Sequence, residues 1–257
     1  MLGQFLGFPV FKLQYMCKPS YFFSDAHLGV NPPGAIENRE ERLVAFLRDL
    51  KGNAEKIFFV GDLFEFWYEY RHYIARGHFP LYRALGDLVD AGTEVHYLMG
   101  NHDFALGDFF PKELGVQVHC FFVCKNIQGH HIYLMHGDGI PQKDWGYRAA
   151  RKLIDAKWAR FLFRKIHPDL GMDLALFVGR NSRRAGASRQ IQIEEYLQAA
   201  TLKMQENACD ICVHGHHHIP GIWEVPAGKV VSTGQWLYSL HYAKLENGKI
   251  ELVTLDR

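Results

Sequence analysis

The stretch EVHYLMGNHD, residues 94–103, runs from a short apolar segment directly into Gly-Asn-His-Asp. Its apolar part is short and rich in aliphatic and aromatic residues, which is typical of a strand buried on both faces. The polar part places side chains that bind metals just beyond the carboxyl end of that strand. Four other segments repeat this arrangement, and together the five decide the fold.

All five segments are apolar runs that stop abruptly at Gly, Asp, Asn or His. They are SYFFSDAH (20–27), KIFFVGD (56–62), EVHYLMGNHD (94–103), HIYLMHGD (131–138) and DICVHGHHH (210–218). Helical patterns lie between them, at 37–50 and 79–92. Such alternation predicts an α/β fold in which a sheet is layered between helices. Residues 222–255 contain short strands separated by tight turns, which predicts a β-meander.

Composition excludes a disordered chain. The 257 residues are 48% hydrophobic and 22% charged, enough for one large globular domain or two small ones. The apolar opening of the chain is interrupted by Lys12, so we do not expect it to span a membrane.

Five cysteines form an odd set without the spacing of a secreted disulfide framework, which favours a reducing compartment. Two of them, Cys209 and Cys212, form a CxxC within a predicted strand, where alternate residues face opposite ways. Core packing is therefore favoured over redox or zinc chemistry for this pair.

Residues 145–207 depart from the alternation of strands and helices. Apolar residues recur at helical spacing from 150 to 166 with basic residues between them, and His167-Pro168 ends that helix. The segment 141–190 carries 12 Lys and Arg against 4 Asp and Glu, a formal charge of +8, so the rest of the chain carries −7. We expect a helical insertion near an anionic partner, which is a phosphate ligand, a membrane surface or a nucleic acid.

The five strand ends together indicate one metal site, because ligands of an open sheet bind where the loops beyond the strands converge. Each residue alone is more often a cap or an ordinary hydrogen-bonding group. Their carboxylates, amide and imidazoles suit Mn, Fe or Zn, and no thiolate is needed. The expected ligands are Asp25, His27, Asp62, Asn101, His136, His216 and His218.

Two divalent ions about 3.5–4 Å apart require a bridging carboxylate, and Asp62 is the natural bridge. We expect hydroxide held between the ions to attack phosphorus, while His102 stabilises or protonates the leaving oxygen. Asp103 either orients His102 or caps the loop. For Glu65 and Asp138 we expect structural roles, as turn hydrogen bonding or support of the ligands.

This ordered series of residues resembles the signature of the calcineurin-like metallophosphoesterases, from about residue 19 to 245. The resemblance implies a four-layer α/β/β/α sandwich that absorbs the strands of 222–255. It also implies a single domain over 19–257 with a helical cap at about 141–207, behind an N-terminal extension of residues 1–18. One ion would take Asp25, His27, Asp62 and His218, and the other Asp62, Asn101, His136 and His216.

A narrower set of motifs is similar to the UDP-2,3-diacylglucosamine diphosphatase family of lipid A biosynthesis. The motifs are SDAHLG, GDLFEFW, GNHDFALGDFF, HGDG followed by DWGY, and RNSRR. This resemblance implies hydrolysis of a diacylated UDP-sugar to UMP and lipid X, usually with Mn²⁺, by a cytoplasmic enzyme held peripherally on the inner membrane. The insertion would hold the acyl chains, and Tyr147, Asn181 and Arg183 or Arg184 would bind near the glucosamine phosphate. One departure is His102, where many relatives have arginine.

Two alternatives remain open at this point. The same metal centre would also suit another phosphoester, in a nucleotide, a phosphoprotein or a nucleic acid, and nucleic-acid binding would show a steep salt dependence. A non-catalytic binder of membranes or lipid phosphates would act through the basic insertion alone. The aromatic residues Trp145, Trp158, Phe161 and Phe163 favour acyl chains over nucleic acid, although core packing explains at least half of this stripe equally well.

Overall fold

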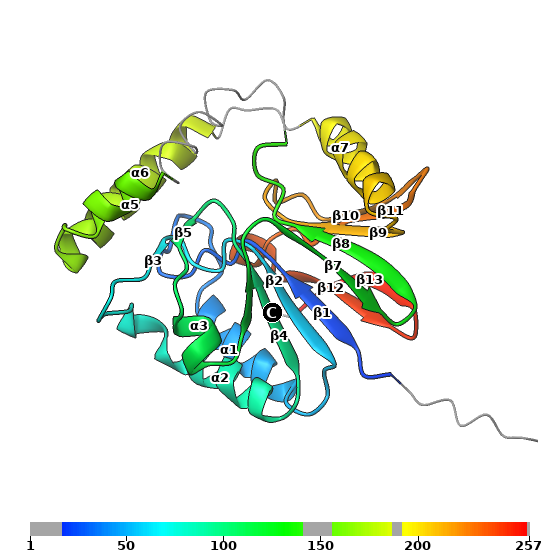
Figure 1. Ribbon diagram of the computed structural model, residues 1–257, viewed down its shortest axis with the longest axis horizontal. Coiled ribbons are helices and arrows are strands. Elements are labelled where there is room, and N and C mark those ends of the chain that lie inside the picture. Colours follow the sequence, from blue (N-terminus) through cyan, green and yellow to red (C-terminus); the bar gives the residue numbers. More distant parts are fainter. Residues whose placement is uncertain (1–16, 141–155, 187–191, 256–257) are drawn as a thin grey trace, which may run out of the picture.

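The structure is a computed structural model that describes residues 17–140, 156–186 and 192–255, without the side chains of 181–186. At its centre two β-sheets pack face to face, with helices on both outer faces (Figure 1). All five predicted strands are present, so the predicted α/β class is confirmed.

The first sheet has six strands in the order β13-β12-β1-β2-β4-β6. Four of them are parallel, and β12 lies antiparallel beside β1. Strands β1, β2 and β4 are buried on both faces over most of their length, as their apolar sequences predict, and Phe22 stacks on Phe58 across the sheet with ring centroids 5.1 Å apart. Their bounds are β1 Ser20–Phe23, β2 Lys56–Val60, β4 Glu94–Leu98, β6 Gln117–His119, β12 His241–Glu246 and β13 Lys249–Thr254.

The second sheet has five strands in the order β10-β11-β9-β8-β7. Here β8 and β9 are parallel neighbours, so their carboxyl ends point to the same edge. A tight turn at Gln128 and Gly129, both with positive φ, joins β7 to β8. The bounds are β7 Phe122–Ile127, β8 His130–Met135, β9 Ile211–His214, β10 Gly221–Val225 and β11 Gly228–Ser232.

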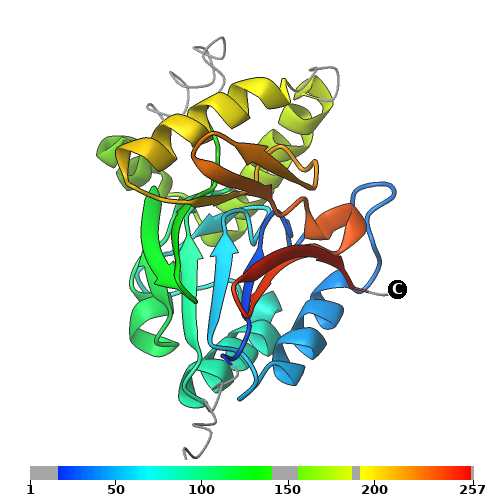
Figure 2. The ribbon, with the colours of Figure 1, turned by 90° about the vertical axis from the view of Figure 1, so that its right-hand side faces the viewer.

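Three apolar clusters separate four layers, which confirms the α/β/β/α architecture. One cluster lies between the first sheet and helices α1 (Arg39–Asp49) and α2 (Phe79–Asp90). A second, including Phe58 and Leu134, lies between the sheets. The third packs the outer face of the second sheet against α7 (Ile193–Glu206), which Figure 2 shows lying across the strands. Shorter elements are β3 Trp67–Tyr68, β5 Asp103–Ala105, η1 Arg76–His78 and α3 Phe109–Glu113.

The predicted meander over residues 222–255 is wrong. Its strands form two hairpins in different sheets, β10-β11 in the second and β12-β13 in the first, joined through the short helix α8 (Trp236–Ser239). The backbone N–H groups of Trp236 and Leu237 both donate to the carbonyl of Asp25, each at 3.2 Å. These bonds draw the connection to the end of β1, and from there the chain enters the other sheet.

The predicted insertion divides into two parts. Helices α5 (Lys157–Phe163) and α6 (Pro168–Gly186) lie apart from both sheets (Figure 1), whereas α7 forms the outer layer over the second sheet. Phe163 attaches α5 to the body, with ring centroids 4.8 Å from Tyr68 and 5.4 Å from Phe104. The Tyr68 hydroxyl also donates to the carbonyl of Arg160 at 2.8 Å.

No helix in the described part of the chain combines the length and the apolar content that a membrane crossing requires.

The two cysteines of the CxxC motif are core residues. Cys209 lies just before β9 rather than within it, so strand alternation does not separate it from Cys212, and both pack in the cluster beneath α7. Burial raises the pKa of the Cys209 thiol to about 12 and also raises that of Cys212. Both are therefore protonated, unreactive thiols, as the core-packing interpretation expects.

An ion pair between His130 and Asp210 gives a testable pH dependence of stability. His130 Nδ1 lies 2.5 Å from Asp210 Oδ2, and this hydrogen bond raises the His130 pKa above its ordinary value of 6.5. A raised pKa stabilises the fold below the unfolded value and loses that effect as pH rises through the folded value. We expect His130→Gln to lower Tm by no more than about 2–4 °C near pH 6, because the pair is partly exposed.

The same substitution should lower Tm by less at roughly pH 9, where the imidazole is neutral in both states and only neutral contacts remain, such as that of Nε2 with the Gly248 carbonyl at 2.9 Å. Differential scanning calorimetry across this range tests the prediction. An equal loss at both pH values would show that the charge of His130 contributes nothing.

Candidate metal centre

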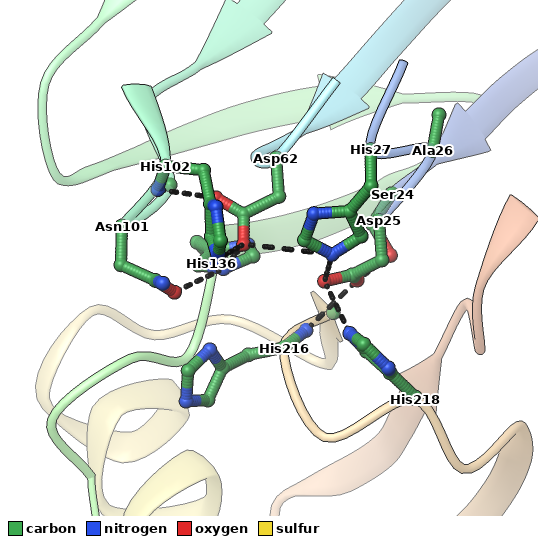
Figure 3. Close-up of polar contacts among 12 residues, drawn as sticks. Ser24, Asp25, Ala26, His27, Asp62, Asn101, His102, His136, His216 and His218 are labelled. Carbon is green, nitrogen blue, oxygen red and sulfur yellow. Dashed lines mark hydrogen bonds and ion pairs between the residues drawn. The ribbon is translucent and has the colours of Figure 1, made fainter. Parts of the chain in front are cut away.

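The ends of five strands from both sheets meet in one place (Figure 3). The first sheet contributes the residues that follow β1, β2 and β4, and the second sheet those that follow β8 and β9. The structure brings together all seven predicted metal-binding residues, which are Asp25, His27, Asp62, Asn101, His136, His216 and His218.

The side chains form two sets of ligand atoms with Asp62 between them. Asp25 Oδ1 lies 3.1 Å from His218 Nε2 and 3.8 Å from His27 Nε2. Asp62 Oδ2 lies 3.2 Å from His136 Nε2 and 4.0 Å from His27 Nε2. The same carboxylate oxygen therefore faces both sets, which is the position a bridging ligand of two cations requires.

Two further residues complete the second set. His216 groups with Asp62 and His136 within ligand-binding reach. The amide oxygen of Asn101 lies 3.2 Å from His136 Nε2. Each set thus combines oxygen and imidazole nitrogen, the ligands that first-row divalent ions accept.

Five of these seven residues have left-handed backbone conformations. They are Asp25, His27, Asp62, His216 and His218, with φ between 44° and 72°. Such conformations cost on the order of 1–3 kcal/mol each for residues other than glycine, and they persist only where the surroundings enforce them. Backbone bonds from the N–H of Asp25 to Gly61 at 3.2 Å and from that of His27 to Asp62 at 3.0 Å help to enforce them.

Close backbone approach also fixes Asp62. A Cβ atom at Gly100 would lie 2.2 Å from Asp62 Oδ1, so only glycine permits this contact. The same carboxylate oxygen accepts a hydrogen bond at 2.8 Å from the backbone N–H of His102. The bridging side chain is thus held by the loop that follows β4.

Electrostatics favour the ligand forms of several side chains. Burial raises the pKa of Asp62, but the opposing charges of His136 and His102 outweigh it and hold that pKa well below its ordinary value. Burial lowers the pKa of His216 to about 4. Ionised carboxylates and neutral imidazoles are the forms that bind metal ions.

The orientation of His136 is set from outside the centre. Its Nδ1 donates to the carbonyl of Val60 at 2.8 Å, which leaves Nε2 directed at Asp62. Burial lowers the His136 pKa, yet the charge of Asp62 and its hydrogen bond outweigh this and raise the pKa. A cation bound here replaces a proton.

The contacts of Asp103 decide between its two expected roles, which were to orient His102 or to cap the loop. Both oxygens of Asp103 are engaged elsewhere: Oδ2 accepts from the N–H of Gly100 at 2.8 Å and of Asp62 at 3.1 Å, and Oδ1 from the Tyr97 hydroxyl at 2.5 Å. His102 Nδ1 instead donates to the carbonyl of Glu65 at 2.6 Å. Asp103 therefore fixes the loops around Asp62, and the expectation that it orients His102 is wrong.

A sequence profile described as calcineurin-like phosphoesterase matches residues 19–220. The chain belongs to this family. Calcineurin-like phosphoesterases are hydrolases that depend on two metal ions, and two sets of ligand atoms are present here. His27 Nε2 adds a further sign of fit, since it is buried and makes no hydrogen bond within the described residues.

Two relatives of this calcineurin-like phosphoesterase carry the name UDP-2,3-diacylglucosamine hydrolase. The Porphyromonas gingivalis protein is 35% identical over 177 residues, which cover 66% of this chain and 65% of that protein. The protein of Escherichia coli strain E24377A is 29% identical over 245 residues, 90% of this chain and 97% of that one. A solved archaeal phosphodiesterase aligns with a TM-score of 0.48 at 13% identity, over 92% of this chain and 99% of the other.

Arg39 is a residue beside the metal centre that the sequence motifs do not single out. Its side chain is buried and hydrogen-bonds to the loop that carries His27. A signal was present, because Arg39, Leu43 and Leu47 recur every four residues and therefore share the buried face of α1. A charged residue on such a face requires specific partners.

Glu65 lies directly beside a metal-binding residue. Its Oε2 atom is 3.2 Å from His27 Nδ1, on the side of the ring away from the ligand atom Nε2. A carboxylate beside the ring nitrogen opposite the ligand atom supports a metal-binding histidine electrostatically. The expectation that Glu65 supports the ligands agrees with this contact.

The predicted substrate-binding residues fall mostly beyond what the structure describes. Tyr147 lies outside the described residues, and Asn181, Arg183 and Arg184 belong to α6 without described side chains. The preceding part of α6 does reach the centre, since a Cβ at Gly179 would lie 2.7 Å from Glu65 Oε1.

Proposed function

We propose that this phosphoesterase hydrolyses the pyrophosphate bond of UDP-2,3-diacylglucosamine, releasing UMP and 2,3-diacylglucosamine 1-phosphate, with Mn²⁺ as its metal. The observation that carries the proposal is helix α6, which exposes large apolar side chains beside the metal centre. The names of the two relatives support it.

Helix α6 has the reverse of an ordinary amphipathic pattern. Its small residues Gly171 and Gly179 face the body, where added Cβ atoms would lie 2.5 Å from the Tyr70 hydroxyl and 2.7 Å from Glu65. Four of its large apolar residues are exposed instead, and Phe177 is 59% exposed, whereas Met172 and Leu176 are half-buried. The exposed set is Leu170, Leu174, Phe177 and Val178. A contiguous apolar surface of this kind marks a site for an apolar partner.

Helix α5 extends this surface and adds positive charge. Trp158, Phe161 and Leu162 are more than half exposed, and Lys165 Nζ lies 5.0 Å from the centre of the Phe161 ring. Apolar rings beside cationic side chains suit a molecule that joins acyl chains to phosphate groups. A nucleotide or a phosphoprotein offers no comparable apolar part.

The residues of the centre divide the chemistry among them. When bound, the two cations polarise the phosphoryl oxygens and lower the pKa of the attacking water. Asp62 holds the two ligand sets together, while Asp103 keeps the loops of Asp62 and Gly100 in place. His102 Nε2 faces the centre 4.0 Å from Asp62 Oδ2, placed to donate a proton to the leaving phosphate oxygen.

The sugar phosphate would bind beside α6. Asn181 follows Gly179 by two residues, and Arg183 and Arg184 come next in the helix. Arginine pairs with phosphate through two parallel hydrogen bonds. We propose these residues and Tyr147 as ligands of the glucosamine phosphate.

An acylated substrate would be delivered at a membrane. We therefore propose that the protein binds peripherally to the cytoplasmic face of the inner membrane through α5 and α6, with no nucleic-acid partner. Flotation with anionic vesicles tests this, and binding that is equal to neutral and anionic vesicles would count against the basic residues.

Comparing substrates tests the function directly. We expect Mn²⁺-dependent release of UMP from the diacylated UDP-sugar with kcat/KM at least about 10²-fold above that for the unacylated UDP-sugar, since burying part of an acyl chain contributes several kcal/mol. Bis(p-nitrophenyl) phosphate serves as a substrate without sugar or acyl chains. Equal kcat/KM for acylated and unacylated sugars would contradict the proposal.

Phe177→Asp tests the exposed surface of α6. We expect KM for the acylated substrate to rise by about 10- to 100-fold, because a charge replaces an apolar contact worth roughly 1.5–3 kcal/mol. Hydrolysis of bis(p-nitrophenyl) phosphate should not change. Leu202→Asp is the matched control, since Leu202 is similarly exposed on α7.

A further inference from the structure

Arg39 is a buried charge at the start of α1 and 4% exposed. Its guanidinium group contacts a single loop. Nε donates to the carbonyl of Ala26 at 3.1 Å and Nη2 to that of His27 at 2.7 Å. Farther along the loop, Nη1 donates to Asn31 Oδ1 at 2.7 Å and Nη2 also to the carbonyl of Val30.

This loop begins with the ligand turn Asp25-Ala26-His27. Asp25 and His27 both have positive φ, so the turn is strained on either side of Ala26. The turn is buried, and without Arg39 the carbonyls of Ala26 and His27 would lose these charge-assisted bonds. The hydrogen bonds from Arg39 thus stabilise the turn at the residues whose backbone conformation is strained.

A second contact fixes Arg39 to the same turn. The indole N–H of Trp236 donates to the Arg39 carbonyl at 3.0 Å, while the backbone N–H of Trp236 donates to the carbonyl of Asp25 at 3.2 Å. Trp236 is fully buried. The start of α1 and the ligand turn are therefore held in one assembly, with the guanidinium group on one side and the indole on the other.

We propose that Arg39 is a positioning residue for the metal set of Asp25, His27 and His218, acting by holding the ligand turn in its strained conformation. This inference rests on the metal centre of the proposed function and not on the identity of the substrate. None of the bonds made by Arg39 reaches the second set, around His136 and His216. That set touches the ligand turn through Asp25, whose Oδ2 accepts from the backbone N–H of His216 at 2.9 Å. Arg39 should thus act mainly on the ion held by Asp25, His27 and His218.

Metal binding of Arg39→Lys and Arg39→Ala tests the proposal. Lysine keeps the charge but cannot bond several carbonyls at once as the guanidinium fork does. We expect isothermal titration with Mn²⁺ to show one site weakened about 10- to 100-fold in both variants, with the other site weakened by less than about threefold. Circular dichroism verifies that each variant is folded. Arg48→Ala, at an exposed position of the same helix, should bind both ions as the unaltered protein does.

Chemical rescue separates positioning from a general loss of structure. A cavity of about 250 Å³ lies beside Arg39, between residues 28–31 and the start of α1. It gives a small cation access to the space that Arg39→Ala leaves. Methylguanidinium at millimolar concentration should restore the weakened Mn²⁺ site at least threefold, whereas methylammonium should not.

Unchanged Mn²⁺ affinity in both variants would overturn the proposal, and so would equal weakening of both sites. If the variants unfold at the assay temperature, the titration is repeated with Arg39→Lys at a lower temperature. An unaltered Mn²⁺ affinity there would also overturn the proposal. A protein that binds two Mn²⁺ ions but does not hydrolyse the acylated UDP-sugar would contradict the proposed function and leave the role of Arg39 intact.

Discussion

Asp62→Ala is expected to lower Mn²⁺-dependent UMP release by at least about 10³-fold, because loss of a bridging carboxylate removes several kcal/mol of stabilisation from the charged transition state. The same oxygen of Asp62 faces His27 at 4.0 Å and His136 at 3.2 Å, so no other side chain stands in the same position. Both metal sets should weaken together, in contrast to the one site mainly affected by Arg39.

The measurement is kcat and Mn²⁺ stoichiometry on the same preparation of Asp62→Ala. Asp87→Ala is the matched control, since Asp87 is a half-exposed carboxylate of α2 that pairs only with Lys51, at 3.7 Å, among the described ion pairs. Activity above about one tenth of the unaltered rate would contradict the two-metal assignment of Asp62, because one unit of log rate is only 1.36 kcal/mol.

His102→Gln is expected to lower kcat by about 10²- to 10⁴-fold, the usual contribution of a positioned general acid. Glutamine keeps a hydrogen-bonding group near the Glu65 carbonyl but cannot transfer a proton. His102 is not one of the seven expected ligands, although it groups with His27 and Glu65 within ligand-binding reach. If it acts as the acid and not as a ligand, Mn²⁺ affinity should change less than threefold, whereas Asp62→Ala weakens both sites.

The dependence on the leaving group is the decisive measurement for His102. Loss of an acid harms substrates with basic leaving groups most, so the defect should be small for p-nitrophenyl esters and large for alkyl esters. His72→Gln, at an exposed position, is the control. A defect of the same size for all leaving groups would show that His102 acts by charge or by structure alone.

Much of the metal centre is predictable because its residues follow strands. In a sheet of parallel strands the carboxyl ends meet at one edge, so a pattern of apolar run and polar end already places Asp25, Asp62 and Asn101 together. The same reasoning applied to β8 and β9 of the second sheet placed His136 and His218. The length of an apolar run and the place of a polar residue directly after it are local features of the sequence, so they can be read without knowing the fold.

The remainder depends on contacts between distant segments. Nothing in residues 222–255 shows that a hydrogen bond from Trp236 to Asp25 divides their strands between two sheets. Likewise, the partners of Asp103 are backbone N–H groups and a tyrosine hydroxyl, which carry no sequence signature of the pairing. Of these residues, only Arg39 could have been found from the sequence, because it is a charged residue on the apolar face of a helix.

The place of β12 beside β1 has a consequence during synthesis on the ribosome. Strand β1, the first of the described strands, lacks one of its two neighbours in the sheet until residues 241–246 have been translated, and the Asp25 turn lacks Trp236 for almost as long. A nascent chain therefore presents an open strand edge to solvent for most of its translation, the state in which chains aggregate or engage chaperones. Chains stalled just before β12 should be sensitive to protease along β1, and chains released after β13 resistant.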